Sequence, residues 1–524
     1  MRHKVTLAAL LALATAAQAA PEPLKLPIVT KPLKLSYWVP ISPNAAAVVK
    51  SYDDIGAYKE VQKRTGIELT FTHVPYTGNT PAQALSLMAA SGELNDIIEY
   101  NWNFYPGGPE KALKDGLIIR LNDYVDQYAP NLKALLDKNP KIRKEITTAD
   151  GDIFAFPFLR VDPSLRVFSG PVIRQDWLTK VRLPAPTTID GWYRTLRAFK
   201  TRDPNGNGKA DELPWVWNGQ SFANGSDALL GAFGGAFALQ GGFFLKDGKV
   251  THHALEPEYK NFLATMRKWY AEGLIDPDYV VANQNQFDAK MLNNLAGSTL
   301  GFAGGTLTRL NDLAKTPGFK LVGAAYPSGK DRVGYNSNPD ANKIFPGTGA
   351  AISSKNRNIR ETVKLLDYAY SKDGSMLFNF GILGQSYVMQ NGQPVFTADV
   401  RNNDKLPFSQ SLARYARGSF DGPFVQDPRV PVRSPEALAA NKTWRRASTA
   451  LLLPPISPAA EDASRFASIM NDVQTYLAEM STRYITGRES LDAYDRFQAT
   501  LKNQGLLDAR AIMQKALDRY NAKK

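Results

Sequence analysis

The sequence predicts an α/β fold with more than one domain. Strand-like and helix-like segments alternate in the order β-α-β-α-β between residues 33 and 100, which is typical of a parallel sheet covered by helices. The chain has 524 residues, more than a single hydrophobic core usually serves. Apolar residues make up 44% of the chain and charged residues 22%, so we expect a globular protein rather than a disordered one.

The first three elements follow from residue spacing and from one helix stop signal. Residues 33–40, LKLSYWVP, alternate in polarity and predict a strand. Residues 53–66 predict a helix that an aspartate caps at its start and Gly66 ends. Residues 67–75, IELTFTHVP, alternate again and predict the second strand.

A second helix and a third strand complete this first unit. The helix is expected at residues 81–94 and the short strand at 95–100. Asn101 follows that strand directly, and Trp102, Asn103 and Phe104 come next. Because ligands of open α/β sheets bind at the carboxyl ends of the strands, we expect these residues to line a crevice.

The later part of the chain indicates a second unit. The sequence becomes strand-like and proline-rich near Phe158–Pro163, where we expect the chain to cross to another domain. Residues 320–329, KLVGAAYPSG, predict a strand that leads back toward the first domain. From residue 457 onward the pattern is mostly helical.

The N-terminus has the pattern of a secretory signal peptide at residues 1–20. A basic start is followed by an apolar run and by Ala17-Gln18-Ala19, an A-x-A cleavage pattern. The chain contains no cysteine, which excludes disulfides, thiolate catalysis and a lipid anchor on a cysteine after the signal. We therefore expect a periplasmic or secreted protein that is not lipid-anchored.

The formal net charge of +13 permits several partners: nucleic acid, an anionic surface or an acidic ligand. No run of basic residues and no nucleic-acid motif is present in the sequence. A scattered, solubilising charge is the simpler interpretation, and an acidic oligosaccharide is the alternative.

Residues 203–214, DPNGNGKADELP, have the spacing of a calcium loop. Calcium takes about six to eight oxygen ligands. Alternating positions offer oxygens from the side chains of Asp203, Asn205 and Asn207, the Lys209 carbonyl, and the carboxylates of Asp211 and Glu212. A solvated Asn-Gly turn is the alternative. All donors are oxygen, which favours a structural calcium ion over a catalytic metal.

Several stretches together carry a resemblance to a known family. The sequence resembles the family 1 extracellular solute-binding proteins of ABC importers, in the branch of the alginate-binding proteins and their lipoprotein relatives. The similar stretches are residues 172–188, 203–214, 247–278, 326–338, 381–396 and 461–487. The loop at 203–214 is similar to the calcium site of the alginate-binding members, with the same six ligand positions.

The resemblance implies a two-lobed periplasmic-binding-protein fold of type II, in which a hinge closes two α/β lobes on a ligand. The chain would cross between the lobes more than once. We expect an N-terminal lobe from residues 21–158 and 321–375, and a C-terminal lobe from 159–320 and 376–524, the latter with a helical tail.

Ligand contacts are predicted from the chemistry of sugars, whose C–H faces stack on aromatic rings and whose hydroxyls bond polar side chains. The candidate residues are Trp38, Asn101, Trp102, Trp215, Trp217, Tyr387 and Trp444, and for a uronate ligand also Arg160 and Arg309, since an arginine fork matches a carboxylate. The alternatives are core packing for the rings and ordinary salt bridges for the arginines.

The leading hypothesis is a monomeric binding protein that captures an oligosaccharide, including an acidic one such as alginate, and delivers it to an ABC importer permease without nucleic acid as a partner. A secreted polysaccharide hydrolase or lyase with a structural calcium site is the rival. A purely structural calcium module is a third class. It is disfavoured because this large α/β chain has a single calcium-like loop instead of an array of them.

Overall fold

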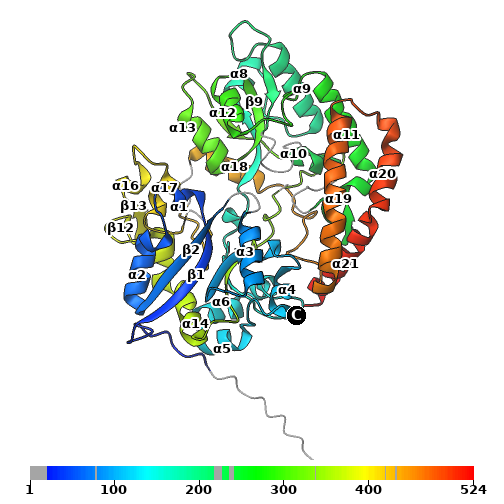
Figure 1. The fold of residues 1–524 in the computed structure, drawn as a ribbon. Helices are drawn as coiled ribbons and strands as arrows, with labels where there is room; N and C mark the ends of the chain where they lie inside the picture. Colours follow the sequence, from blue (N-terminus) through cyan, green and yellow to red (C-terminus); the bar gives the residue numbers. More distant parts are fainter. Residues whose placement is uncertain are drawn as a thin grey trace, which may run out of the picture.

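The computed structural model describes residues 20–76, 80–217, 227–234, 241–336, 338–418, 421–430 and 434–523. The predicted signal peptide lies outside these ranges except for its last residue. Figure 1 shows two lobes, with the N-terminal sheet (blue) in one and the green helices and strands in the other. Within the described ranges, no helix has the length and apolarity to cross a membrane.

The first lobe is built on a five-stranded sheet in the order β2-β1-β3-β11-β4. Strand β1 pairs in parallel with both β2 and β3, which confirms the predicted β-α-β-α-β arrangement. Strand β11 joins antiparallel to β3 and to β4. The strands are β1 (Leu33–Ile41), β2 (Ile67–Pro75), β3 (Ile97–Asn101), β4 (Phe156–Pro157) and β11 (Thr348–Ile352).

Helices pack around this sheet, and most of β3 is buried, as expected for a strand covered on both faces. The helices of this lobe are α1 (Pro43–Ala46), α2 (Gly56–Thr65), α3 (Thr80–Ser91), α4 (Gly108–Lys114), α5 (Asn122–Tyr128), α6 (Pro130–Lys138), α7 (Pro140–Ile146), α14 (Ile359–Tyr368), α15 (Lys372–Phe380), α16 (Ala398–Arg401) and α17 (Phe408–Ala413), with the hairpin β12 (Tyr387–Gln390) and β13 (Gln393–Phe396) beside them.

The ends of α2 test two local predictions. Gly66 ends the helix in the left-handed region at φ 76°, where a Cβ would also lie 2.5 Å from the Val29 carbonyl oxygen, so the predicted stop is confirmed. The predicted aspartate cap is wrong. Ser51 caps a separate 3₁₀ turn at Tyr52–Asp54, and α2 itself begins at Gly56.

The second lobe contains a four-stranded sheet in the order β10-β5-β9-β6. Its strands are β5 (Ser169–Arg174), β6 (Leu213–Trp215), β9 (Ala296–Phe302) and β10 (Leu321–Gly323), and a hairpin is formed by β7 (Phe243–Lys246) and β8 (Lys249–His252). Its helices are α8 (Gln175–Val181), α9 (Ile189–Thr201), α10 (Asp227–Leu230), α11 (Pro257–Ala271), α12 (Gln284–Leu292), α13 (Arg309–Leu313), α18 (Pro435–Trp444), α19 (Ala460–Ile485), α20 (Tyr494–Asn503) and α21 (Leu506–Ala522).

The chain crosses between the lobes three times, and two predicted boundaries need correction. The first crossing follows β4, at the predicted place. The return does not begin at residue 321, because β10 pairs with β5 inside the second lobe. Residues from 376 to about 425 do not belong to the second lobe, because Leu377, Phe378 and Phe424 are part of the first lobe's core.

The helical tail lies on the second lobe but reaches the first. Figure 1 shows α19, α20 and α21 (orange to red) along one side of the molecule, with the C-terminus near α4. There the Lys523 ammonium donates to the Thr147 carbonyl oxygen at 2.5 Å. Burial lowers the pKa of Lys523 to about 8. The tail therefore joins the two lobes in addition to the three chain crossings.

Candidate functional site

A cavity of about 650 Å³ opens on the first lobe at the carboxyl ends of β1 and β3, where the strand-end rule places ligands. Its volume is in the range of small-ligand sites. The lining residues are Val39, Pro40, Ser42, Pro43, Asn44, Tyr52, Tyr76, Pro81, Ala82, Glu99, Tyr100, Asn101, Phe104, Thr348, Arg417 and Asp421. All of them belong to the first lobe.

The polar rim comes from residues that end strands or begin the next element. Ser42 follows the end of β1 and caps α1 by accepting from the Ala45 amide at 3.2 Å. Asn101, at the end of β3, lines the cavity as predicted, and its Oδ1 accepts from the Asn103 amide at 3.2 Å. These local bonds fix the loops at the mouth of the cavity before any ligand binds.

Two aromatic rings stand exposed on the cavity wall. Phe104 is 67% exposed and Tyr76 is 51% exposed, although both are large and apolar. An exposed ring beside polar groups suits the C–H face of a sugar, which stacks on it while its hydroxyls bond the rim.

The floor of the cavity is a buried ion pair between Glu99 and Arg417. The Arg417 guanidinium donates to both Glu99 carboxylate oxygens, at 2.8 and 2.7 Å, and also to the Tyr58 hydroxyl at 2.9 Å. Tyr37 donates to Glu99 at 2.7 Å. Burial alone would lower the pKa of Arg417, but Glu99, Tyr58 and Tyr52 together outweigh it, and the pKa lies well above its ordinary value. Arg417 therefore stays charged, and its bonds to Glu99 hold β3 to the segment after α17.

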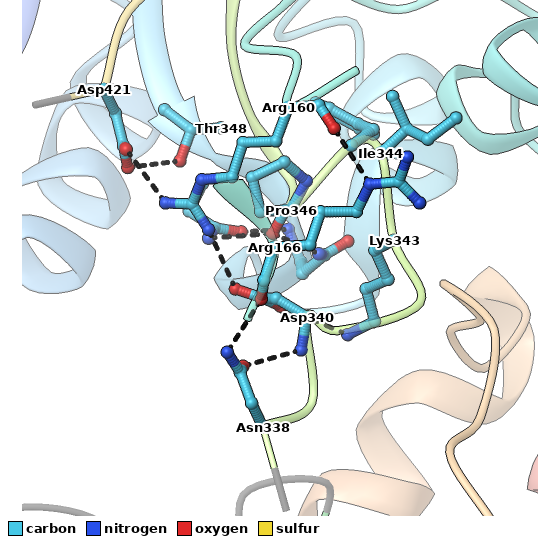
Figure 2. Close-up of polar contacts among 12 residues, drawn as sticks. Arg160, Arg166, Asn338, Asp340, Lys343, Ile344, Pro346, Thr348 and Asp421 are labelled. Atoms are coloured by element: carbon cyan, nitrogen blue, oxygen red, sulfur yellow. Dashed lines mark hydrogen bonds and ion pairs between the residues drawn. The ribbon is translucent and has the colours of Figure 1, made fainter. Parts of the chain in front are cut away.

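Arg160 lies at the crossings between the lobes and does not line the cavity. Its guanidinium is 3.5 Å from the Asp340 carboxylate and 3.8 Å from that of Asp421, as Figure 2 shows. These three residues lie on or beside the first, second and third crossings, respectively. The Arg160 guanidinium also packs over the rings of Phe158 and Phe168, at 5.4 and 5.0 Å from their centres. The structure thus places Arg160 as a link among the crossing segments.

The three predicted aromatic residues of the first lobe pack in its core instead of on the cavity. Trp38 packs against Tyr100 in the sheet. Trp102 turns inward, and its Nε1 donates to the Gly349 carbonyl oxygen at 3.0 Å. Tyr387 packs against Phe380 beneath the β12–β13 hairpin. Their exposed fractions are 3%, 0% and 8%.

The predicted tryptophans of the second lobe are buried as well. Trp215 packs on Trp192 at 4.9 Å between ring centres, and Trp217 packs on Tyr279 at 4.7 Å. Trp444 donates to the carbonyl oxygens of Pro171 and Ala324.

Arg309, the other predicted uronate partner, makes a two-point ion pair with Asp288 at 2.7 and 2.8 Å. It lies on α13 in the second lobe and does not line the cavity. Of the nine predicted ligand residues, Asn101 alone lines it.

The loop at 203–212 lies in the second lobe between α9 and β6. The Asp203 carboxylate accepts from the Gly206, Asn207 and Gly208 amides, and Asp203 itself has a positive φ of 44°. The amide groups of Asn205 and Asn207 donate to Asp211. These bonds form a tight loop in which alternate side chains turn inward.

Glu212 is the buried member of this loop. Its Oε1 has no hydrogen-bond partner in the described structure, and burial, with the nearby charges of Asp203 and Asp211, raises the pKa of its carboxyl group. Among the described residues, no group of three or more His, Cys, Asp and Glu side chains has the arrangement of a metal site. A cation here would need amide and carbonyl oxygens as well as carboxylates.

The sequence prediction missed most of the cavity wall. Ser42 and Tyr76 directly follow the ends of β1 and β2. The strand-end rule that identified Asn101 could therefore also have found these two residues. No sequence signal could have found Arg417, because its partner Glu99 is 318 residues away.

Comparison with known proteins agrees with this two-lobed architecture. Residues 46–376 match the family of bacterial extracellular solute-binding proteins. The chain is 27% identical over 491 residues to the fructooligosaccharide ABC transporter substrate-binding protein FusA of Streptococcus pneumoniae, covering 89% of this chain and 87% of FusA. It is 28% identical over 337 residues to the polygalacturonan/rhamnogalacturonan-binding protein YtcQ of Bacillus subtilis, covering 63% of each chain.

Among solved structures, that of the alginate-binding protein AlgQ2 without calcium ion is similar with a TM-score of 0.75 and 28% identity, over 94% of this chain and 99% of AlgQ2. Because the family match spans more than half of the chain, and the fold has the same two lobes, this protein belongs to the family of bacterial extracellular solute-binding proteins.

Proposed function

We propose that this protein captures an oligosaccharide in the first-lobe cavity, closes the second lobe over it and delivers it to the permease of an ABC importer. The observation that supports this most is the cavity itself: about 650 Å³, at the strand ends, with the exposed rings of Phe104 and Tyr76 beside polar side chains. All the lining residues come from one lobe, which fits a clamp that completes its site on closure.

The names of the relatives support a glycan as ligand but leave its charge open. FusA is named for a neutral fructooligosaccharide, whereas YtcQ and AlgQ2 are named for polygalacturonan and alginate, which are acidic. We therefore propose an oligosaccharide as the ligand, whether neutral or acidic.

Binding without turnover is the form of function that the cavity favours. A glycoside hydrolase needs two carboxylates that can act as acid and base or nucleophile. Glu99 and Asp421 are the carboxylates among the described lining residues, and Glu99 is held in two-point contact with Arg417. One carboxylate that remains able to reach a sugar does not make a catalytic pair.

The protein would act as an exported monomer that diffuses freely in the periplasm. This part of the proposal rests on the signal-peptide pattern and on the absence of cysteine from the sequence.

The loop at 203–212 would hold a calcium ion that stiffens the second lobe. Its donors are all oxygen, and the buried, unpartnered Glu212 Oε1 is a ligand position that a cation would satisfy. The amides of Asn205 and Asn207 would have to turn their oxygens toward the ion. Since Trp215 and Trp217 lie in the core, the ion would stabilise the lobe rather than shape the cavity wall.

The test is a thermal-shift screen with neutral and acidic oligosaccharides, followed by calorimetry of the hits and analysis of the glycan after incubation. A ligand at a hundredfold excess over its dissociation constant should stabilise the protein by about 2.7 kcal/mol. The glycan should be recovered intact. Cleavage of the glycan by the pure protein, or no response to any glycan, would contradict the proposal.

A further inference from the structure

The charge of the cavity wall can be counted residue by residue. The described lining residues include two carboxylates, on Glu99 and Asp421, and one cation, Arg417. Arg417 is 2% exposed, and its terminal nitrogens bond Glu99, Tyr58 and the Asp421 carbonyl oxygen. Its positive charge is therefore already balanced by Glu99 and is not presented to a ligand.

Asp421 is the charged group that reaches the cavity. Its side chain is 39% exposed. The Thr348 hydroxyl donates to its Oδ2 at 3.2 Å, and Oδ1 lies 3.8 Å from the Arg160 guanidinium, too far for a hydrogen bond. A carboxylate in this position can accept hydrogen bonds from the hydroxyl groups of a sugar.

Arg160, the cation beside Asp421, does not provide a positive charge for a ligand. Arg160 is not among the described lining residues; it lies between the carboxylates of Asp340 and Asp421 (Figure 2) and packs over the rings of Phe158 and Phe168. Its charge faces these two carboxylates, and the Lys343 ammonium lies 3.6 Å from the Asp340 carboxylate as well. Among the described lining residues, the wall thus presents the Asp421 carboxylate and no cation beyond Arg417, which Glu99 already pairs.

We propose that the cavity selects neutral oligosaccharides over uronates and that Asp421 is the specificity-determining residue. This inference rests on the proposed function. A neutral sugar gives hydroxyl donors to Asp421, whereas a uronate brings a like charge to a wall on which no described lining residue offers a further cation, which penalises the wrong ligand.

The test uses pairs of oligosaccharides that differ only at C6: oligogalacturonate with its carboxyl-reduced form, and oligoalginate with its carboxyl-reduced form, together with a fructooligosaccharide as a further neutral ligand. Calorimetry at pH 7 should give a dissociation constant at least about tenfold lower for the neutral member of a pair that binds. Tighter binding of the acidic member would overturn this inference and leave the proposed function standing. Failure of every glycan to bind would overturn both.

A single variant tests the role of Asp421 apart from the other residues of the cavity wall. Asp421→Asn keeps an acceptor for Thr348 but removes the charge, so the preference for the neutral member should shrink by about tenfold. The matched control is Asp123→Asn, a carboxylate of the same lobe that is 74% exposed and does not line the cavity; it should leave the preference unchanged. An unchanged preference in Asp421→Asn would overturn the assignment of specificity to Asp421.

Discussion

Both lobes bury tryptophans, but among the described residues the first lobe also exposes aromatic rings. In the second lobe, Trp192, Trp215 and Trp217 are buried and pack on one another or on Tyr279. In the first lobe, Phe104 projects from the cavity wall into solvent. A buried ring stabilises the fold and an exposed ring is available to a ligand. Under the proposed function, the first lobe therefore carries the binding surface, and the second lobe would close over it.

The lobes also differ in how their polar sites are held. The loop at 203–212 is closed by bonds among neighbours in sequence, such as those from the Asp203 carboxylate to the amides that follow it. The cavity floor is held by Glu99 and Arg417, which lie on segments far apart in the chain. Changes in the loop should weaken one lobe locally, whereas changes in the floor should disturb the binding surface as well.

The largest expected effect is on the second lobe's core. Trp215→Ala removes a ring that is 1% exposed and packs on Trp192, so the free energy of unfolding should fall by about 3–5 kcal/mol. Urea denaturation measures it, and the dissociation constant of a bound glycan should stay the same while the protein is folded. A loss of affinity without a loss of stability would reverse the roles assigned to the lobes.

The second largest loss of stability is expected at the cavity floor. Arg417→Ala leaves the Glu99 charge buried without its partner, which costs about 3 kcal/mol or more in stability. The double variant Glu99→Gln with Arg417→Met carries no stranded charge and should recover part of this loss. If both variants are equally destabilised, the charge of Glu99 is not the cause.

Removal of calcium should have an intermediate effect. With the ion at a hundredfold excess over its dissociation constant, chelation should remove about 2.7 kcal/mol of stability and lower the Tm. Asp203→Ala should lower the Tm in calcium and abolish the response to chelator. A Tm that does not change with chelator in the wild-type protein would show that the loop is closed by its own hydrogen bonds alone.

The smallest effect on stability is expected at the exposed ring. Phe104→Ala should change the free energy of unfolding by no more than about 0.5 kcal/mol. The same change should weaken glycan binding by roughly 1 kcal/mol, about fivefold, because it removes the stacking surface. Leu87→Ala, another exposed apolar residue of the first lobe that does not line the cavity, is the control and should leave affinity unchanged.

Local signals predicted the framework well. The three parallel strands and the stop at Gly66 follow from alternation and from one glycine, and the strand-end rule located Asn101 at the cavity. The tryptophans could not be assigned in this way. Whether Trp102 turns inward depends on its bond to Gly349, 247 residues away, and that partner is unknown until β11 joins the sheet.

The attachment of the C-terminal helix to the first lobe limits the motions that the molecule can make. The three chain crossings lie together around Arg160, and Lys523 adds a further bond between the lobes at the Thr147 carbonyl oxygen. A wide opening of the lobes would therefore have to break this bond and release the end of the last helix.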